Sequence, residues 1–66
     1  MANNDLTDRE LEILKLIAEG LTNILISEKL HISEYTVETH RKNINAKLGA
    51  NSTATLLQKA REGGHI

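Results

Sequence analysis

Signals that start and stop a helix recur at short intervals along this chain of 66 residues, so that only helices of modest length fit between them. The first start signal is the capping box Thr7-Asp8-Arg9-Glu10, in which the hydroxyl of residue 7 accepts from a backbone amide and the carboxylate of residue 10 reaches back. The other candidate N-caps are Thr22, Ser33 and Ser52, and the candidate helix ends are Gly20, Gly49 and Gly63-Gly64. His31 lies between two of these helices, where a residue in the left-handed conformation is often needed.

These boundaries predict an all-α fold. The predicted four-helix bundle has helices at about residues 7–19, 22–30, 33–48 and 52–62. The chain contains no Pro, and no segment shows the alternation of a strand. We expect one domain at residues 5–62, with a disordered tail at residues 1–4 and a flexible tail at residues 63–66.

The apolar residues indicate which faces of these helices are buried. Helical spacing along the first helix is followed by Leu11, Leu14, Ile17, Ala18 and Leu21. Ile13 and Leu16 lie outside that stripe, so we expect the first helix to be covered on a second side. The core face of the third helix is predicted to consist of Val37, Ile44 and Leu48.

The composition argues against an enzyme, a metal site and a membrane protein. The absence of Cys removes disulfides, thiolate ligands and thiol nucleophiles. His31, His40 and His65 lack the partner spacing of a metal-binding helix, and the glycines form no phosphate-binding loop. No apolar run approaches the length of a membrane span, and the N-terminus lacks the pattern of a signal peptide. We therefore expect a cytoplasmic protein without a cofactor.

The charge is unevenly distributed along the chain. The formal net charge is −1, which by itself does not favour nucleic-acid binding. Residues 1–34 carry seven acids and three bases, whereas residues 35–66 carry two acids and five bases. The second half can therefore present a positive face in spite of the negative total.

The middle of the chain has the spacing of a helix-turn-helix. A short helix, the three residues 31–33 and a longer amphipathic helix follow one another, an order in which the second helix can enter the major groove. The face of that helix opposite its core residues carries Tyr35, Glu38, Thr39 and Lys42. Lys42 can donate to guanine, Glu38 can accept from cytosine N4, and Thr39 can touch a thymine methyl group. An ordinary solvated face is the alternative interpretation of these four residues.

Longer stretches of the sequence point to one family. The stretches are Leu6-Thr7-Asp8-Arg9-Glu10, Ala18-Glu19-Gly20-Leu21-Thr22-Asn23, Thr36-Val37-Glu38-Thr39-His40-Arg41 and Lys47-Leu48-Gly49. From about Asp5 to Ala60 the chain closely resembles the LuxR/NarL (GerE-type) DNA-binding domain. The resemblance implies bacterial transcription regulation by binding double-stranded DNA as a homodimer on inverted-repeat sites through the last helix. It also implies an N-terminal receiver or ligand-sensing domain in the parent chain, and association with the nucleoid when bound.

The resemblance assigns roles to individual residues. The family's base-reading positions fall on Tyr35, Glu38, Thr39 and Lys42. Its phosphate-contacting positions fall near Asn23, Ser33, Thr36, Arg41 and Lys47. At the last helix we expect a dimer interface, because its apolar residues exceed what so short a helix needs for one core; these are Leu56, Leu57 and Ala60.

The chain also departs from the family's pattern. Ile24-Leu25 stands where the family commonly has Lys-Glu, which removes a phosphate contact and half of a capping box with Thr22. Glu38 replaces a Lys of several members, and Thr53 replaces a common Arg. The apolar pair is either a substitution without function or a small docking patch. The alternative functions are therefore a protein-interaction module that uses this patch, and a helical domain that is inactive without its regulatory half.

Overall fold

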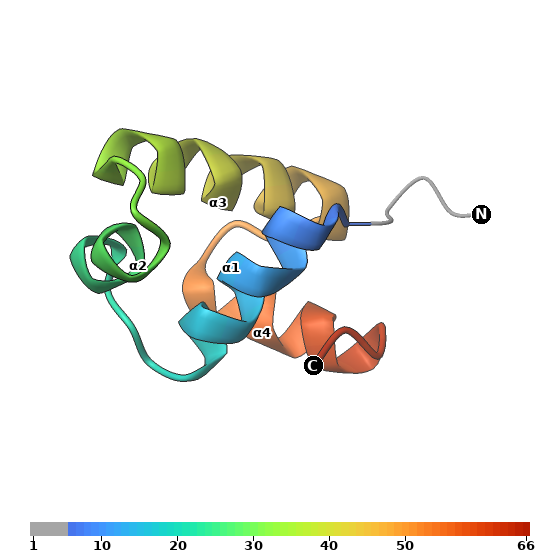
Figure 1. Cartoon of the computed structure of the whole chain (residues 1–66). Helices are drawn as coiled ribbons and strands as arrows, with labels where there is room; N and C mark the ends of the chain where they lie inside the picture. The colour runs from blue at the N-terminus through green and yellow to red at the C-terminus, as the bar shows by residue number, and fades with distance from the viewer. Residues whose placement is uncertain (1–5) are drawn as a thin grey trace.

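The computed structural model describes residues 6–66, which form four α-helices and no strand. The helices are α1 (Asp8–Ala18), α2 (Asn23–Leu30), α3 (Glu34–Leu48) and α4 (Thr53–Glu62) (Figure 1). The predicted all-α fold is confirmed, and the predicted ranges run slightly long because they included the capping residues. The tail predicted at residues 1–4 lies outside the described residues.

All four predicted N-caps are confirmed. In each case the side-chain oxygen of the cap accepts from the backbone N–H three residues later, in the pairs Thr7–Glu10, Thr22–Leu25, Ser33–Thr36 and Ser52–Thr55. At the first helix the box is reciprocal, because the Thr7 backbone N–H donates to Glu10 Oε1 at 2.9 Å. At each helix start, the side chain of the capping residue therefore accepts a hydrogen bond from one of the backbone N–H groups that have no partner within the helix.

The four helices also end in the same way. Within two residues of its end, each is followed by a residue with a positive φ angle, namely Gly20, His31, Gly49 and Gly64. The next N–H then donates to the carbonyl five residues earlier, in the pairs Leu21–Leu16, Ile32–Ser27, Ala50–Asn45 and His65–Ala60. The last pair lies within the segment 63–66 for which a flexible tail is predicted, and there the Gly-Gly sequence closes α4 with a hydrogen-bonded turn.

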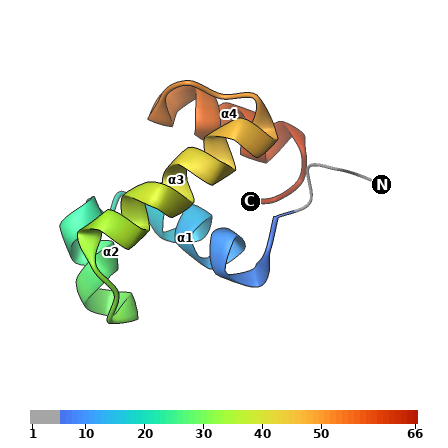
Figure 2. The same ribbon diagram turned by 90° about the horizontal axis from the view of Figure 1, so that it is seen from above.

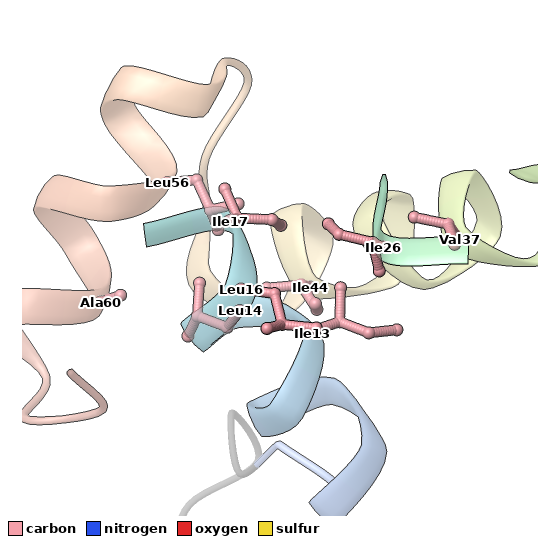
Figure 3. Close-up of a cluster of buried hydrophobic side chains, with 9 residues drawn as sticks. All are labelled: Ile13, Leu14, Leu16, Ile17, Ile26, Val37, Ile44, Leu56 and Ala60. Atoms are coloured by element: carbon pink, nitrogen blue, oxygen red, sulfur yellow. The ribbon is translucent and has the colours of Figure 1, made fainter. Parts of the chain in front are cut away.

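The third helix is the centre of the fold, because it contacts each of the other three. The second helix lies near its beginning and the fourth helix near its end, as the view from above shows (Figure 2). The buried core gathers side chains from all four helices (Figure 3): Ile13, Leu14, Leu16, Ile17, Ile26, Val37, Ile44, Leu56 and Ala60.

The core confirms the second covered side of the first helix and corrects one residue. Ile13 and Leu16 are buried together with Leu14 and Ile17. Ala18 is exposed, although the sequence placed it on the buried stripe. The buried arc is centred nearer Ile13 and Ile17, so that Ala18 lies at its edge. Leu48 is half-buried and packs against the core, as predicted.

No helix within residues 6–66 has both the length and the apolar character that crossing a membrane requires.

Candidate nucleic-acid interface

The second and third helices form the predicted helix-turn-helix. Only residues 31–33 separate them, and His31 adopts the left-handed conformation with φ 58° and ψ 43°. Ile26 from α2 and Val37 from α3 are both fully buried in the shared core (Figure 3). A tight turn and core packing thus set the angle between the two helices and the direction in which the outer face of α3 points.

The four predicted base-reading residues lie on that outer face. The structure exposes all of them, and Tyr35 has the largest exposed fraction among the large apolar side chains, 81%. Thr39 Oγ1 donates to the carbonyl of Tyr35 at 3.1 Å, so its methyl group and oxygen lone pairs are what it offers to a ligand. The members of this reading strip are Tyr35, Glu38, Thr39 and Lys42.

One residue of the reading strip is tied to the second helix. Asn23 Nδ2 donates to Glu38 Oε1 at 3.0 Å. Asn23 is half-buried and is the first residue of α2, directly after the Thr22 cap. The family resemblance predicts a phosphate contact for Asn23. No local pattern in the sequence predicts its hydrogen bond to Glu38, which lies 15 positions further along the chain.

Three other predicted phosphate contacts lie at ends of helices or connect them. Ser33 Oγ and Thr36 Oγ1 are 2.9 Å apart at the start of α3, and both hydroxyls reach the surface there. Arg41 Nη2 donates to Thr53 Oγ1 at 2.7 Å and links α3 to the start of α4. A guanidinium carries five N–H groups, so Arg41 retains donors for a phosphate.

Lys47 differs from the other predicted phosphate contacts. Its Nζ atom lies 2.7 Å from Oε1 of the buried Glu10 on α1. Burial by itself raises the pKa of Glu10, but the hydrogen bonds from Lys47 and Thr7 and the charge of Lys47 outweigh it and hold that pKa below its ordinary value of 4.5. The ion pair therefore competes with any phosphate for the amino group of Lys47.

The fourth helix corrects the predicted dimer interface. Leu56 and Ala60 are 1% and 0% exposed, because both belong to the core of the single chain (Figure 3). Leu57 is half-buried. The expectation of surplus apolar surface was wrong for the two buried residues, since a core this small requires them.

The apolar pair at the start of the second helix is open to solvent. Ile24 is 52% exposed and Leu25 is 49% exposed, so neither belongs to the core. Thr22 Oγ1 accepts from the Leu25 backbone N–H at 3.3 Å, which is one half of a capping box. The second half is missing because Leu25 has no side-chain acceptor.

The described residues contain no group of three or more His, Asp or Glu side chains that could hold a metal ion. His40 is half-buried on α3, and its Nδ1 atom is buried without a hydrogen-bond partner.

Comparison with known proteins points in the same direction as the geometry. The family model described as bacterial regulatory proteins, luxR family, matches residues 4–60. The response regulatory protein YgeK of Escherichia coli K12 is 51% identical over 59 residues, which cover 89% of this chain and 40% of that protein. The transcriptional regulatory protein MctR of Rhizobium johnstonii is 47% identical over 64 residues, covering 97% of this chain and 30% of that protein.

A solved structure has the same fold. The response regulator ChrA of a heme-sensing two-component system superposes with a TM-score of 0.91 at 40% identity, over 94% of this chain and 31% of that one. The chain therefore spans less than half the length of each of these relatives.

Proposed function

Because this chain belongs to the luxR family of bacterial regulatory proteins, whose domain binds DNA in transcription regulation and is not an enzyme, we propose that it binds specific DNA sequences with α3 in the major groove. The observation that carries this proposal is the reading strip. Its four side chains are exposed on one face of a helix whose opposite face holds the buried Val37 and Ile44. A helix that is anchored through its buried face and carries polar groups on its outer face suits the reading of base edges.

The proposed active form is a homodimer on an inverted repeat. A single domain with a net charge of −1 is expected to bind non-specific DNA weakly, with a dissociation constant on the order of 10⁻⁴–10⁻⁶ M. We propose that two copies meet through the outer face of α4, where Ala54, Leu57, Gln58 and Arg61 follow helical spacing and none is fully buried.

Spacing of the half-sites tests the dimer. Half-site centres about one helical turn apart should give cooperative binding. Inserting five base pairs rotates the half-sites to opposite faces of the duplex and should abolish cooperativity. Leu57→Asp should have the same effect on the unmodified site, with Lys59→Ala as the control on the same helix. Unchanged cooperativity on the spaced site would rule the dimer out.

The parent chain is proposed to be a response regulator. YgeK is a response regulatory protein and ChrA is a response regulator by name, and this chain matches only part of each. We propose that a receiver domain precedes this domain and that the whole protein acts at the nucleoid, in the cytoplasm. Phosphorylation of such a parent should raise its affinity for the inverted repeat above that of the unphosphorylated form.

A protein-interaction module is the second candidate function. The observation that favours it is the exposure of Ile24 and Leu25, at 52% and 49%. Salt separates the two candidates, because binding through phosphates weakens steeply as salt is added whereas docking of apolar side chains changes little. A steep loss of DNA affinity between 50 and 200 mM salt, which is roughly the range where such losses are large, supports the DNA-binding function.

A further inference from the structure

We propose that Asn23 and Glu38 recognise a base as a unit: Asn23 holds one oxygen of the Glu38 carboxylate so that the other oxygen selects cytosine in the major groove. The inference rests on the proposed placement of α3 and adds a base preference and a positioning residue to it. The positioning residue comes from α2, the helix that is not itself placed on the base edges.

The contact between the two side chains has a defined polarity. Asn23 Nδ2 lies 3.0 Å from Glu38 Oε1. An ionised carboxylate can only accept hydrogen bonds, so the amide must face it with its NH₂ group. Asn23 is half-buried at the first position of α2, and the Thr22 cap fixes the backbone there. The donor is thus better ordered than the exposed carboxylate that it holds.

The hydrogen bond leaves the second carboxylate oxygen available. Within residues 6–66, Glu38 Oε2 has no hydrogen-bond or ion-pair partner. Lys42 lies one turn further along the same helix, at the spacing where Glu and Lys attract each other, and it too has no ion pair among the described residues. Holding Glu38 toward α2 keeps these two opposite charges apart, so that both remain available to bases.

The chemistry of a carboxylate decides which base fits. Guanine presents two acceptors in the major groove, and thymine presents an acceptor and a methyl group, so both repel a carboxylate oxygen or leave it unpaired. Cytosine presents the N4 amino donor. Adenine presents a donor beside the N7 acceptor and is therefore the weaker match. A carboxylate held in one orientation loses less freedom on binding than a free one, which sharpens the preference.

The test measures base preference and overall affinity separately. Duplexes bound by the 66-residue chain are selected from a random pool, and the position that responds to Glu38→Gln is then varied through all four base pairs. The wild-type chain should prefer cytosine there. Glu38→Ala should lower the preference for cytosine over thymine by roughly 5-fold or more, and Glu38→Gln should move the preference toward adenine.

The second helix is tested with two variants of Asn23. Asn23→Ala and the isosteric Asn23→Asp, which lacks the donor, should both reduce the preference for cytosine over the other bases severalfold. The added carboxylate of Asn23→Asp also repels phosphates, so for that variant only the ratio of affinities between duplexes is compared. In the Glu38→Ala background, Asn23→Ala should have no further effect on preference. Asn51→Ala, at an exposed asparagine in the connection before α4, serves as the control, and thermal melts check that every variant is folded.

Each contrary result has a distinct meaning. If Asn23→Ala weakens all duplexes equally, Asn23 is a phosphate contact and the pairing is wrong. If its effect persists in full without Glu38, the two residues act independently and the proposal is again wrong. If the wild-type chain enriches no sequence at all, the failure lies with sequence-specific binding itself.

Discussion

Lys47 Nζ and the backbone N–H of Thr7 both bond to the same atom, Glu10 Oε1, at 2.7 and 2.9 Å. The buried carboxylate therefore joins the start of α1 to the end of α3. A capping residue of one helix thus also anchors the helix that carries the reading strip. The relationship assigns Lys47 a role in the fold that is separate from DNA.

The first prediction concerns the removal of the cation. Lys47→Met should destabilise the fold by about 1–3 kcal/mol, because Glu10 stays buried without its charged partner. The expected loss of stability is smaller than for a fully buried ion pair because the Lys47 side chain is 31% exposed. Thermal melts should show a midpoint lower by about 4–8 °C for each kcal/mol. Lys42→Met, at an exposed lysine, is the matched control; an equal fall in both variants would contradict the role of the ion pair.

The second prediction concerns acid. The pKa of Glu10 is lowered in the folded chain, so the unfolded chain binds a proton more readily at this residue. The stabilisation by Glu10 is thus present above its unfolded pKa, near 4.5, and is lost as the pH falls through the lower folded value. The free energy of unfolding, measured by urea titration at a series of pH values, should fall in that window. Glu10→Gln should flatten the dependence of the free energy of unfolding on pH in this window. An unchanged slope in this variant would refute the stabilisation by ionised Glu10.

The third prediction concerns the turn between α2 and α3. His31 is the one non-glycine residue with positive φ among residues 6–66, and this conformation disfavours a side chain. His31→Gly should therefore stabilise the fold by about 0.5–1 kcal/mol. Gly49→Ala is the converse control: its φ is +70° with nothing within 4 Å of an added Cβ, so about 1 kcal/mol should be lost through the backbone alone. A destabilised His31→Gly variant would mean that the imidazole makes a stabilising contact.

The fourth prediction concerns the exposed apolar pair. Ile24→Lys together with Leu25→Glu should leave the thermal midpoint unchanged or slightly higher, since both side chains are about half exposed. The new glutamate can accept from the Thr22 backbone and complete the capping box, a gain of under about 1 kcal/mol. The new lysine should steepen the slope of the logarithm of DNA affinity against the logarithm of salt concentration by about one unit. A large fall in the midpoint would place these residues in the core.

Local sequence signals were sufficient to predict the helices. The hydroxyl caps, the glycine ends and the left-handed His31 act within a few residues, and all appear in the structure where the sequence placed them. The assignment of Leu56 and Ala60 to a dimer interface was wrong, because whether a short helix has apolar side chains to spare depends on how much core the whole chain must fill. The pairs Asn23–Glu38 and Glu10–Lys47 were missed for a related reason: they join different helices across 15 and 37 positions, and no local pattern encodes such contacts.

Selection of duplexes from a random pool, repeated with Lys42→Ala and Glu38→Ala, tests the central claim most directly. The wild-type chain should enrich a defined motif, and each variant should relax it at particular base pairs, at a cost of roughly 1–3 kcal/mol on the preferred site. This result is expected because both side chains lie exposed on the outer face of α3. Variants that bind every duplex more weakly by the same factor, with the motif unchanged, would contradict the claim that this face reads bases.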